Sequence, residues 1–389
     1  MVAASLTPSC PGSDHAMTLP SLLPAAWHEL SEQVIEASRA GTALRIVGMG
    51  TRSFLGDPGP GRPLSTLGLQ GIVNYQPAEL FITAQAGTPL AHLEDILAQH
   101  GQYLAFEPPR FAMPPPGGGT VGGMVAAGIS GPGRMAGGSV RDALLGAVVL
   151  DGHGQVLRFG GQVIKNVAGY DVSRLMAGAL GTLGVLLEVT LRVAPQPAAS
   201  ATRHFQMPQA QALEQVNRWV AQAHPIQASA WHQGTLWVRL AGAHAAVREA
   251  EQVLGGEAVS PEHAERDWRQ LRDHHHAVLQ RDQALPLWRL AVPPTHPPLA
   301  LAGPTLVEWH GGQRWLRTDL PASAVRAAAR AAGGHATRWH RGSSGADPDA
   351  SAYTPLGGAM ALIERRLKHA FDPAGIFNPG RRPFADLPG

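Results

Sequence analysis

The run between Met113 and Gly123 constrains the fold of this chain more than any other feature. Five glycines and three prolines fall within these eleven residues. Glycine has no Cβ and lets a backbone N–H come close to a bound group, whereas proline fixes φ and removes a donor from any sheet ladder. The run therefore predicts a rigid loop that lies against a flat, anionic ligand such as a nucleotide.

Two common nucleotide-binding loops do not fit this run. The spacing of Gly117, Gly119 and Gly122 matches the dinucleotide fingerprint, but that fingerprint must follow a hydrophobic strand directly. Here three prolines at 114–116 precede the glycines, and such a stretch cannot be a central strand. No Lys-Ser or Lys-Thr pair follows, which excludes a nucleoside-triphosphate loop. Taken alone, the run fits either a nucleotide cradle or a structural turn.

Two further glycine segments favour the cradle. Residues 44–53 combine an apolar run with the small-residue turn Gly48–Thr51. Residues 165–171 lead through a short helical stretch into the glycine-rich segment 178–184, which precedes another apolar run. Three glycine turns beside strand-like runs predict one extended ligand that several loops contact, which suits a dinucleotide better than a small substrate.

The ordered set of motifs resembles the vanillyl-alcohol oxidase (PCMH-type) family of FAD-binding flavoproteins. The matching segments are residues 47–51, 116–123, 139–142, 165–171, 181–184 and 371–381. Together they extend the resemblance over roughly residues 20–195 and 355–389. Within the family the chain is most similar to the FAD-binding subunits of bacterial glycolate oxidases, on the basis of residues 128–134, residues 309–315 and a short middle region.

The resemblance implies a fold, a cofactor and partners. The expected fold class is α+β, with a two-subdomain PCMH-type FAD-binding domain and a smaller, ferredoxin-like α+β cap domain. The implied activity is oxidation of glycolate, a small 2-hydroxy acid, to glyoxylate by a complex. The implied partners are a larger catalytic FAD-binding subunit and an iron–sulfur subunit, with this chain supporting catalysis or relaying electrons.

The resemblance also implies which residues contact FAD. Backbone N–H groups of the first turn would bind the pyrophosphate, the second loop would follow the phosphates and ribose, and the third would pack near the adenine. Two serines are candidate hydrogen-bond donors, with ordinary loop hydroxyls as the alternative. Arg141 and Asp142 are expected to pair with each other. The predicted contacts are Gly48, Met49, Gly50, Thr51, Arg52, Pro116, Gly119, Thr120, Gly122, Gly123, Ser130, Ser139, Gly181, Thr182, Val185 and Asn378.

The attachment of the flavin follows from one position in the first turn. Many members of the family bind FAD covalently through a histidine there, and the corresponding residue of this chain is Thr51. A threonine hydroxyl is far less nucleophilic than an imidazole. The single cysteine, Cys10, lies outside the matching segments. We therefore expect non-covalent FAD.

Substrate-binding residues are less distinct. A 2-hydroxy acid requires a cation for its carboxylate, for which arginine is suited, and a base for its hydroxyl proton. The leading candidates are Arg314 and His310, which flank Gly311 and Gly312 in a tryptophan-bounded segment. The alternative is that these tryptophans build the cap core and Arg314 stacks on one of them. The other candidates are Arg289, Arg338 and His340.

No metal site is expected. Catalytic relatives that oxidise D-2-hydroxy acids carry a histidine-rich metal motif with an internal acid, and this sequence lacks it. Three consecutive histidines at 274–276 point in different directions on a helix, so we expect a solvated face there. The missing motif argues against catalysis by this chain alone.

Composition limits the remaining classes. A chain of 389 residues with 44% hydrophobic and 15% charged residues predicts two ordered domains. A net charge of +2 without a basic–aromatic patch argues against nucleic-acid binding. One cysteine cannot ligate an iron–sulfur cluster, so such a carrier must reside on another chain. The absence of a signal peptide or an 18-residue apolar stretch predicts a cytoplasmic protein, peripheral at the inner membrane face only through its partners.

The expected domains are a disordered leader (1–20), the FAD-binding domain (21–197), the cap (198–350) and a C-terminal segment that returns to the FAD-binding domain (351–389). Hydrophobic periodicity predicts helices over 25–40, 89–100, 209–222, 243–254, 322–332 and 355–370. Strands are expected at 43–47, 71–75, 80–84, 143–150, 155–158, 185–193, 202–206, 228–232, 235–241, 287–292, 306–309, 313–317 and 335–339. We detect no long internal repeat.

Three functions remain open. The chain is an FAD subunit that supports a complex, a self-sufficient FAD-dependent D-2-hydroxy-acid dehydrogenase of the D-lactate type, or a scaffold that has lost its flavin. The missing metal motif argues against the second function. The intact glycine turns argue against the third.

Overall fold

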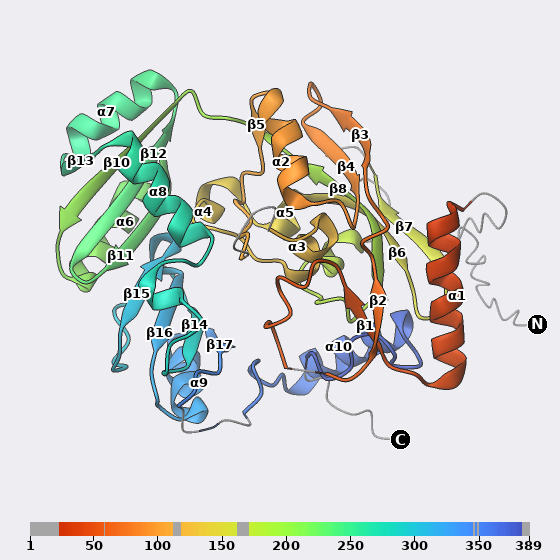
Figure 1. Cartoon of the computed structure of the whole chain (residues 1–389). Helices are drawn as coiled ribbons and strands as arrows, with labels where there is room; N and C mark the ends of the chain where they lie inside the picture. The colour runs from red at the N-terminus through yellow and green to blue at the C-terminus, as the bar shows by residue number, and fades with distance from the viewer. Residues whose placement is uncertain are drawn as a thin grey trace, which may run out of the picture.

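The computed structural model describes residues 23–57, 59–111, 118–161, 171–344, 347 and 350–382. Its two larger β-sheets lie side by side, each with helices packed on it (Figure 1), and two two-stranded sheets accompany them. The leader 1–20, the predicted flavin contact Pro116 and most of the motif at 165–171 lie outside the described residues.

The first sheet has five antiparallel strands in the order β3-β4-β8-β6-β7. Its central strands are apolar on both faces because both faces are covered. Strands β6 and β7 form a hairpin, and Asp151 closes it by accepting the N–H groups of His153 at 2.9 Å and Gln155 at 2.8 Å. The strands are β3 (Ile72–Gln76), β4 (Phe81–Gln85), β8 (Val185–Arg192), β6 (Leu144–Leu150) and β7 (Val156–Gly160).

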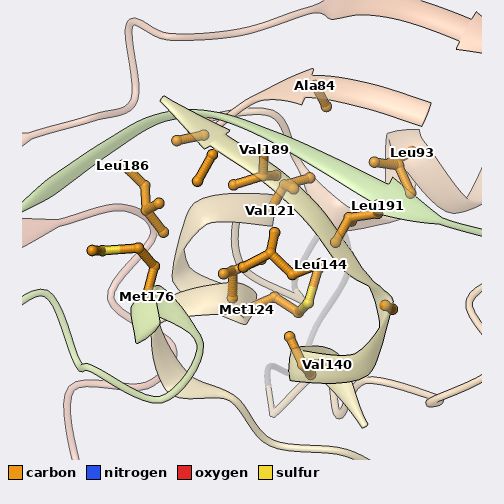
Figure 2. Close-up of a cluster of buried hydrophobic side chains, with 14 of the residues drawn as sticks. Ala84, Leu93, Val121, Met124, Val140, Leu144, Met176, Leu186, Val189 and Leu191 are labelled. Carbon is orange, nitrogen blue, oxygen red and sulfur yellow. The ribbon is translucent and has the colours of Figure 1, made fainter. Parts of the chain in front are cut away.

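Two hydrophobic cores cover the two faces of this sheet. One core joins it to α2 (Leu90–Gln99), α3 (Val121–Ala127) and α5 (Val140–Ala143). Figure 2 shows Val121 and Met124 of α3 packed among Leu144, Val189 and Leu191 of the strands. The second core joins it to α1 (Ala25–Ala40), to the parallel pair β1 (Leu44–Val47) and β2 (Arg62–Ser65), and to residues 376–377 near the C-terminus.

The glycine run is not a loop throughout, as the sequence suggested. A helix, α3, begins after Thr120, whose hydroxyl accepts the N–H of Gly123 at 3.2 Å. Gly122 permits this helix because a Cβ there would lie 2.6 Å from the Cβ of Ala86 on the neighbouring chain segment. The glycines therefore let α3 approach the sheet closely, which periodicity alone could not reveal.

The second sheet has eight strands in the order β13-β10-β12-β11-β15-β16-β14-β17. Its first half follows the β-α-β-β-α-β order of a ferredoxin-like unit, with the outer helices on the left of Figure 1. The elements are β10 (Ala199–Gln206), α6 (Gln209–Ala221), β11 (Ile226–His232), β12 (Thr235–Gly242), α7 (His244–Leu254) and β13 (Glu257–Val259).

The second half repeats this topology, which the sequence did not reveal. Its strands pair in the equivalent order, and the two halves meet edge to edge where β11 pairs with β15. An irregular segment at 292–304 stands where the first helix of the unit would be, and this hides the repeat. The elements are β14 (Leu287–Ala291), β15 (Thr305–Glu308), β16 (Gln313–Arg317), α9 (Ala322–Ala331) and β17 (His335–His340).

Two further helices complete the fold. A helix that we did not predict, α8 (Pro261–Arg272), joins the two halves; Ser260 caps it and proline occupies its first turn. The C-terminal helix α10 (Gly358–Phe371) returns toward β1, in the lower part of Figure 1. The short elements are β5 (Gln102–Tyr103), α4 (Arg134–Gly137), η1 (Ser173–Met176), β9 (Ala194–Pro195), η2 (Ala277–Leu279) and η3 (Trp309–Gly311). Among the helices of the described ranges, none has the length and apolar composition required to cross a bilayer.

Candidate flavin site

A cleft lies between the β1–β2 pair, α3 and the turn at 178–184. Five predicted flavin contacts line it, and they come from four separate parts of the chain: Gly48, Gly122, Gly123, Gly181 and Asn378. The remaining lining is mostly apolar, with Ile46, Ala126, Met176 and Leu186 among its residues. The fold therefore brings the dispersed glycine motifs to one place.

The first turn of the cleft offers donors. Within the described part of the chain, the backbone N–H groups of Gly48, Gly50 and Thr51 have no protein acceptor. Gly50 has a φ of 73°, which a residue with a Cβ rarely adopts. Unengaged N–H groups in a tight turn form a concave site for an anion such as a pyrophosphate. The turn thus fits the phosphates of a dinucleotide.

The second loop contributes shape rather than donors. The N–H of Gly122 donates to Ala86 O at 2.7 Å, and that of Gly123 donates to the Thr120 hydroxyl. A Cβ on Gly48 would lie 2.6 Å from the Thr120 hydroxyl, so the first and second loops meet closely. Gly119 has a φ of 80° and also lies where the two loops meet, because a Cβ on it would come too close to the side chains of Thr51 and Arg52.

The third turn is held from behind by the C-terminal segment. The Asn378 side chain accepts the N–H of Ile46 at 2.8 Å and donates to Leu180 O at 2.6 Å. It therefore joins the first strand of the site to the turn that contains Gly181. The Thr182 hydroxyl donates to Ala179 O at 2.7 Å, within the turn. Val185 lies in the core beneath α1 rather than in the cleft lining.

The two predicted serines are engaged within the protein. Ser130 accepts the N–H of Val140 at 3.2 Å, and Ser139 caps α5 in a capping box with Asp142. The expected pairing of Arg141 with Asp142 is wrong, because the Asp142 carboxylate accepts both the N–H and the hydroxyl of Ser139. Those bonds lower the pKa of Asp142.

Arg52 supports the site from inside. The residue is 8% exposed, and its guanidinium donates to Pro109 O at 2.7 Å and to Gly118 O at 3.2 Å, so it fixes both sides of the loop before α3. Burial lowers its pKa to about 10. Met49, in the same turn, is 37% exposed.

The two leading substrate candidates serve the cap fold instead. The His310 Nδ1 lies 2.9 Å from the Ser229 hydroxyl, and burial lowers the pKa of His310 to about 4. Arg314 donates to three backbone carbonyls, those of Gly311, Pro297 and His296. Trp309 and Trp315 are buried, so the tryptophans do build the cap core, but Arg314 crosslinks loops rather than stacking on them. Arg338 likewise donates to carbonyls near residue 350.

The expectation of a solvated histidine face at 274–276 is also wrong for His274, whereas His275 is exposed. His274 follows the end of α8, has a φ of 62° and packs against Phe111, Trp315 and Trp339 with ring centroids 4.9–5.5 Å apart. Burial lowers its pKa well below the usual value, and its Nδ1 has no acceptor or donor in the described residues. The chain reversal after α8, which the sequence did not indicate, turns this ring inward.

An arginine from the cap reaches the first flavin turn. Arg281 lies 3.8 Å from the ring centroid of Phe54 and donates to Thr51 O at 3.4 Å. Phe54 also contacts Phe111 and His340. The aromatic cluster around His274 is therefore continuous with the turn that offers the free N–H groups. Among the described residues, no group of three His, Cys, Asp or Glu side chains is arranged to bind a metal.

A buried polar network lies in the cap beside this cluster. The Arg289 Nε donates to Gln313 Oε1 at 2.6 Å, and Gln313 in turn donates to the Glu308 carboxylate at 3.0 Å. Glu308 also accepts the indole N–H of Trp315 at 2.5 Å. Burial raises the pKa of Glu308 to about 7, and burial lowers that of Arg289 to about 10. No local pattern marked Glu308, which occupies the last position of β15 directly after Leu306 and Val307.

Glu308 is expected to make stability depend on pH. Its pKa rises from 4.5 to about 7 on folding, so the folded state retains a proton that the unfolded state has lost. The stabilisation is complete below pH 4.5 and is lost as the pH rises to about 7, on the order of 3 kcal/mol. Glu308→Gln should therefore gain stability relative to the natural chain over that interval, as measured by urea unfolding at pH 5 and pH 8. Equal differences at both pH values would contradict the assignment.

Comparison with known proteins agrees with the geometry. Residues 21–160 match the family described as FAD binding domain. The chain is 41% identical over 360 residues to glycolate oxidase subunit GlcE of Escherichia coli, covering 92% of this chain and 97% of that one. The chain belongs to the GlcE family of glycolate oxidase subunits. The FAD-binding domain predicted from the glycine motifs is thereby confirmed.

More distant relatives cover only part of the chain. D-2-hydroxyglutarate dehydrogenase of Xanthomonas citri is 31% identical over 37% of this chain and 29% of its own length. Glycolate oxidase subunit GlcD of Bacillus subtilis is 36% identical over 21% of this chain and 18% of its own. Solved structures of alkyldihydroxyacetonephosphate synthase share the fold of this GlcE-family chain, with a TM-score of 0.62 at 14% identity over 92% of this chain and 76% of theirs.

Proposed function

We propose that this chain is the FAD-binding subunit of a glycolate oxidase complex that converts glycolate to glyoxylate. The supporting observation is the similarity to a GlcE subunit over nearly its whole length, combined with a first glycine turn in which the N–H groups of Gly48, Gly50 and Thr51 have no acceptor among the residues that the structure describes. Its partners in the complex would be the catalytic flavoprotein subunit and an iron–sulfur subunit. The complex would act in the cytoplasm or at the inner face of the membrane.

FAD is proposed to bind across the cleft. Gly48, Gly50 and Thr51 would hold the pyrophosphate, and the Gly119 turn would lie beside it. Gly122, Gly123 and Gly181 would let the dinucleotide approach the backbone, with the apolar lining against its flat rings. When bound, the flavin supplies a hydride or electron acceptor. Onward electrons would leave through a partner, because the only cysteine is Cys10 and no cluster can be ligated here.

One observation favours a hydroxy-acid site in this chain as a second candidate. The Nη atoms of Arg289 have no acceptor among the described residues, and the unpartnered His274 imidazole contributes to the same electrostatic environment. A guanidinium fork with free donors suits a carboxylate, and the unpartnered nitrogen of a neutral imidazole can accept a hydrogen bond from a hydroxyl group. This arrangement would support an FAD-dependent 2-hydroxy-acid dehydrogenase without a metal.

Anaerobic spectroscopy separates these functions. The purified chain is expected to retain yellow flavin and to show no bleaching by glycolate, whereas the assembled complex should bleach. Bleaching of the isolated chain that Arg289→Met abolishes would favour the second candidate. A folded but colourless chain after loading with excess FAD and gel filtration would overturn both.

The flavin is expected to be attached without a covalent bond. The Thr51 hydroxyl already accepts an N–H of Arg52 at 3.1 Å, and it is a weak nucleophile. Acid precipitation of the loaded protein should therefore release all of the FAD into the supernatant. Flavin fluorescence that stays with the denatured band on a gel would contradict this expectation.

A further inference from the structure

The N-terminal half of α10 exposes apolar side chains to solvent. Met360 and Ile363 are at helical spacing, yet they are 56% and 57% exposed. Leu362 in the same half of the helix is 37% exposed, and Leu356, just before the helix, is 40% exposed. Of the 14 residues of this helix only Phe371 is buried. An exposed apolar group of this kind marks an interaction surface.

The opposite side of α10 is attached to the flavin site. Lys368 donates to Thr182 O at 2.7 Å and to Phe377 O at 3.0 Å, which are neighbours of the cleft residues Gly181 and Asn378. A protein that covers the exposed side would therefore sit next to the flavin-binding turns. That is the position required of a subunit that exchanges electrons with this chain.

The charges of α10 indicate the chemistry of the occupant. The segment 358–363 carries no charge, whereas the second half contains Arg365, Arg366 and His369, besides Lys368 and Glu364, which pair with Asp372 and Arg382. Arg366 and His369 are exposed at the edge of the apolar group. A complementary surface would have an apolar centre and acidic residues at its margin.

We propose that the exposed apolar surface formed by Met360, Leu362 and Ile363 of α10, with Leu356 just before the helix, is the docking surface for another subunit of the same oxidoreductase complex. This inference rests on the proposed function, in which the chain works as one subunit among several. The partner surface is apolar and bordered by carboxylates. Binding there would cover the helix that the isolated chain leaves exposed.

The test is assembly of the complex from co-expressed subunits. The tagged chain is co-expressed with the catalytic flavoprotein and iron–sulfur subunits and purified by its tag. With Ile363→Glu, the amount of co-purified partner subunits should be at least tenfold lower than with the natural chain. The matched control is Val253→Glu, which places the same charge at a 61% exposed site on α7 and should retain the partners fully. Both variants should keep FAD and the thermal midpoint of the natural chain, which shows that they fold.

Other occupants give different results. Full assembly with Ile363→Glu would overturn the proposal. The proposal would also be overturned if the isolated chain formed a dimer that Ile363→Glu, but not Val253→Glu, abolished. Binding of the isolated chain to phosphatidylglycerol vesicles with the same dependence would overturn it as well. If a chain truncated after Arg382 bound more hydrophobic dye than the full chain, and Ile363→Glu abolished that increase, the apolar surface would be assigned to contact with residues 383–389. Assembly that depends on Ile363 without glycolate bleaching would overturn the proposed function and leave the docking surface intact.

Discussion

Gly122→Leu is expected to abolish FAD retention. The Cβ of any residue at this position would lie 2.6 Å from the Ala86 Cβ and 3.0 Å from the Ala86 carbonyl oxygen. The same carbonyl accepts the N–H of residue 122, so the contact cannot relax without breaking that hydrogen bond. The helix α3 must then move away from the sheet, and it carries Gly123 and Ala126 of the cleft lining with it.

The size of this effect follows from the packing. Forcing extra carbon atoms into a close-packed contact costs about 1–3 kcal/mol, and displacement of a cofactor wall costs affinity as well. We expect at least a hundredfold weaker FAD binding by fluorescence titration, with a reduced thermal midpoint. Gly68→Leu is the matched control, since a Cβ at Gly68 meets no atom within 4 Å. Normal FAD retention by Gly122→Leu would show that α3 does not form a wall of the flavin site.

The sequence predicted the helices, strands and turns of this fold more accurately than the roles of individual side chains. Helix α1 ends at Gly41, as expected, because its φ of 61° suits glycine and its N–H reaches Ala37 O and Ser38 O. The glycine turns also meet at one cleft, as predicted. Turn chemistry and periodicity are local properties, so a single sequence carries them. The pairing of β11 with β15, which joins the two cap halves, has no such local signal.

Side-chain roles could not be predicted for the same reason. An arginine suits a carboxylate or a set of backbone carbonyls equally well, and Arg314 takes the carbonyls because the fold places Pro297 and Gly311 around it. The spacing of Met360 and Ile363 predicts one helix face but not whether this chain covers it. The inward position of His274 depends on a left-handed residue after α8. Each outcome depends on contacts distant in the sequence.

Asp372→Ala is expected to unfold the C-terminal connection to the flavin site. The Asp372 carboxylate is fully buried; it pairs with Lys368 and accepts the N–H groups of Ile376 at 3.0 Å and Phe377 at 2.8 Å. The residues that it fixes pair with β1: Leu44 N–H donates to Ile376 O at 2.7 Å, and Asn378 N–H donates to Leu44 O at 2.8 Å. Loss of the carboxylate therefore removes the support of Asn378.

The cost should be among the largest for a single substitution in this chain. Removing one partner of a buried ion pair costs about 3–5 kcal/mol, because the remaining charge is left uncompensated. Urea unfolding should show this loss, and FAD should dissociate at lower urea than the midpoint of unfolding. Asp319→Ala, at an exposed position, is the control and should change neither. Because Asp372 lies outside the cleft lining, weaker flavin binding in its variant would reflect the position of β1 and Asn378. If Asp372→Ala lost the expected free energy of unfolding but bound FAD as the natural chain does, the C-terminal segment would stabilise the fold without shaping the flavin site.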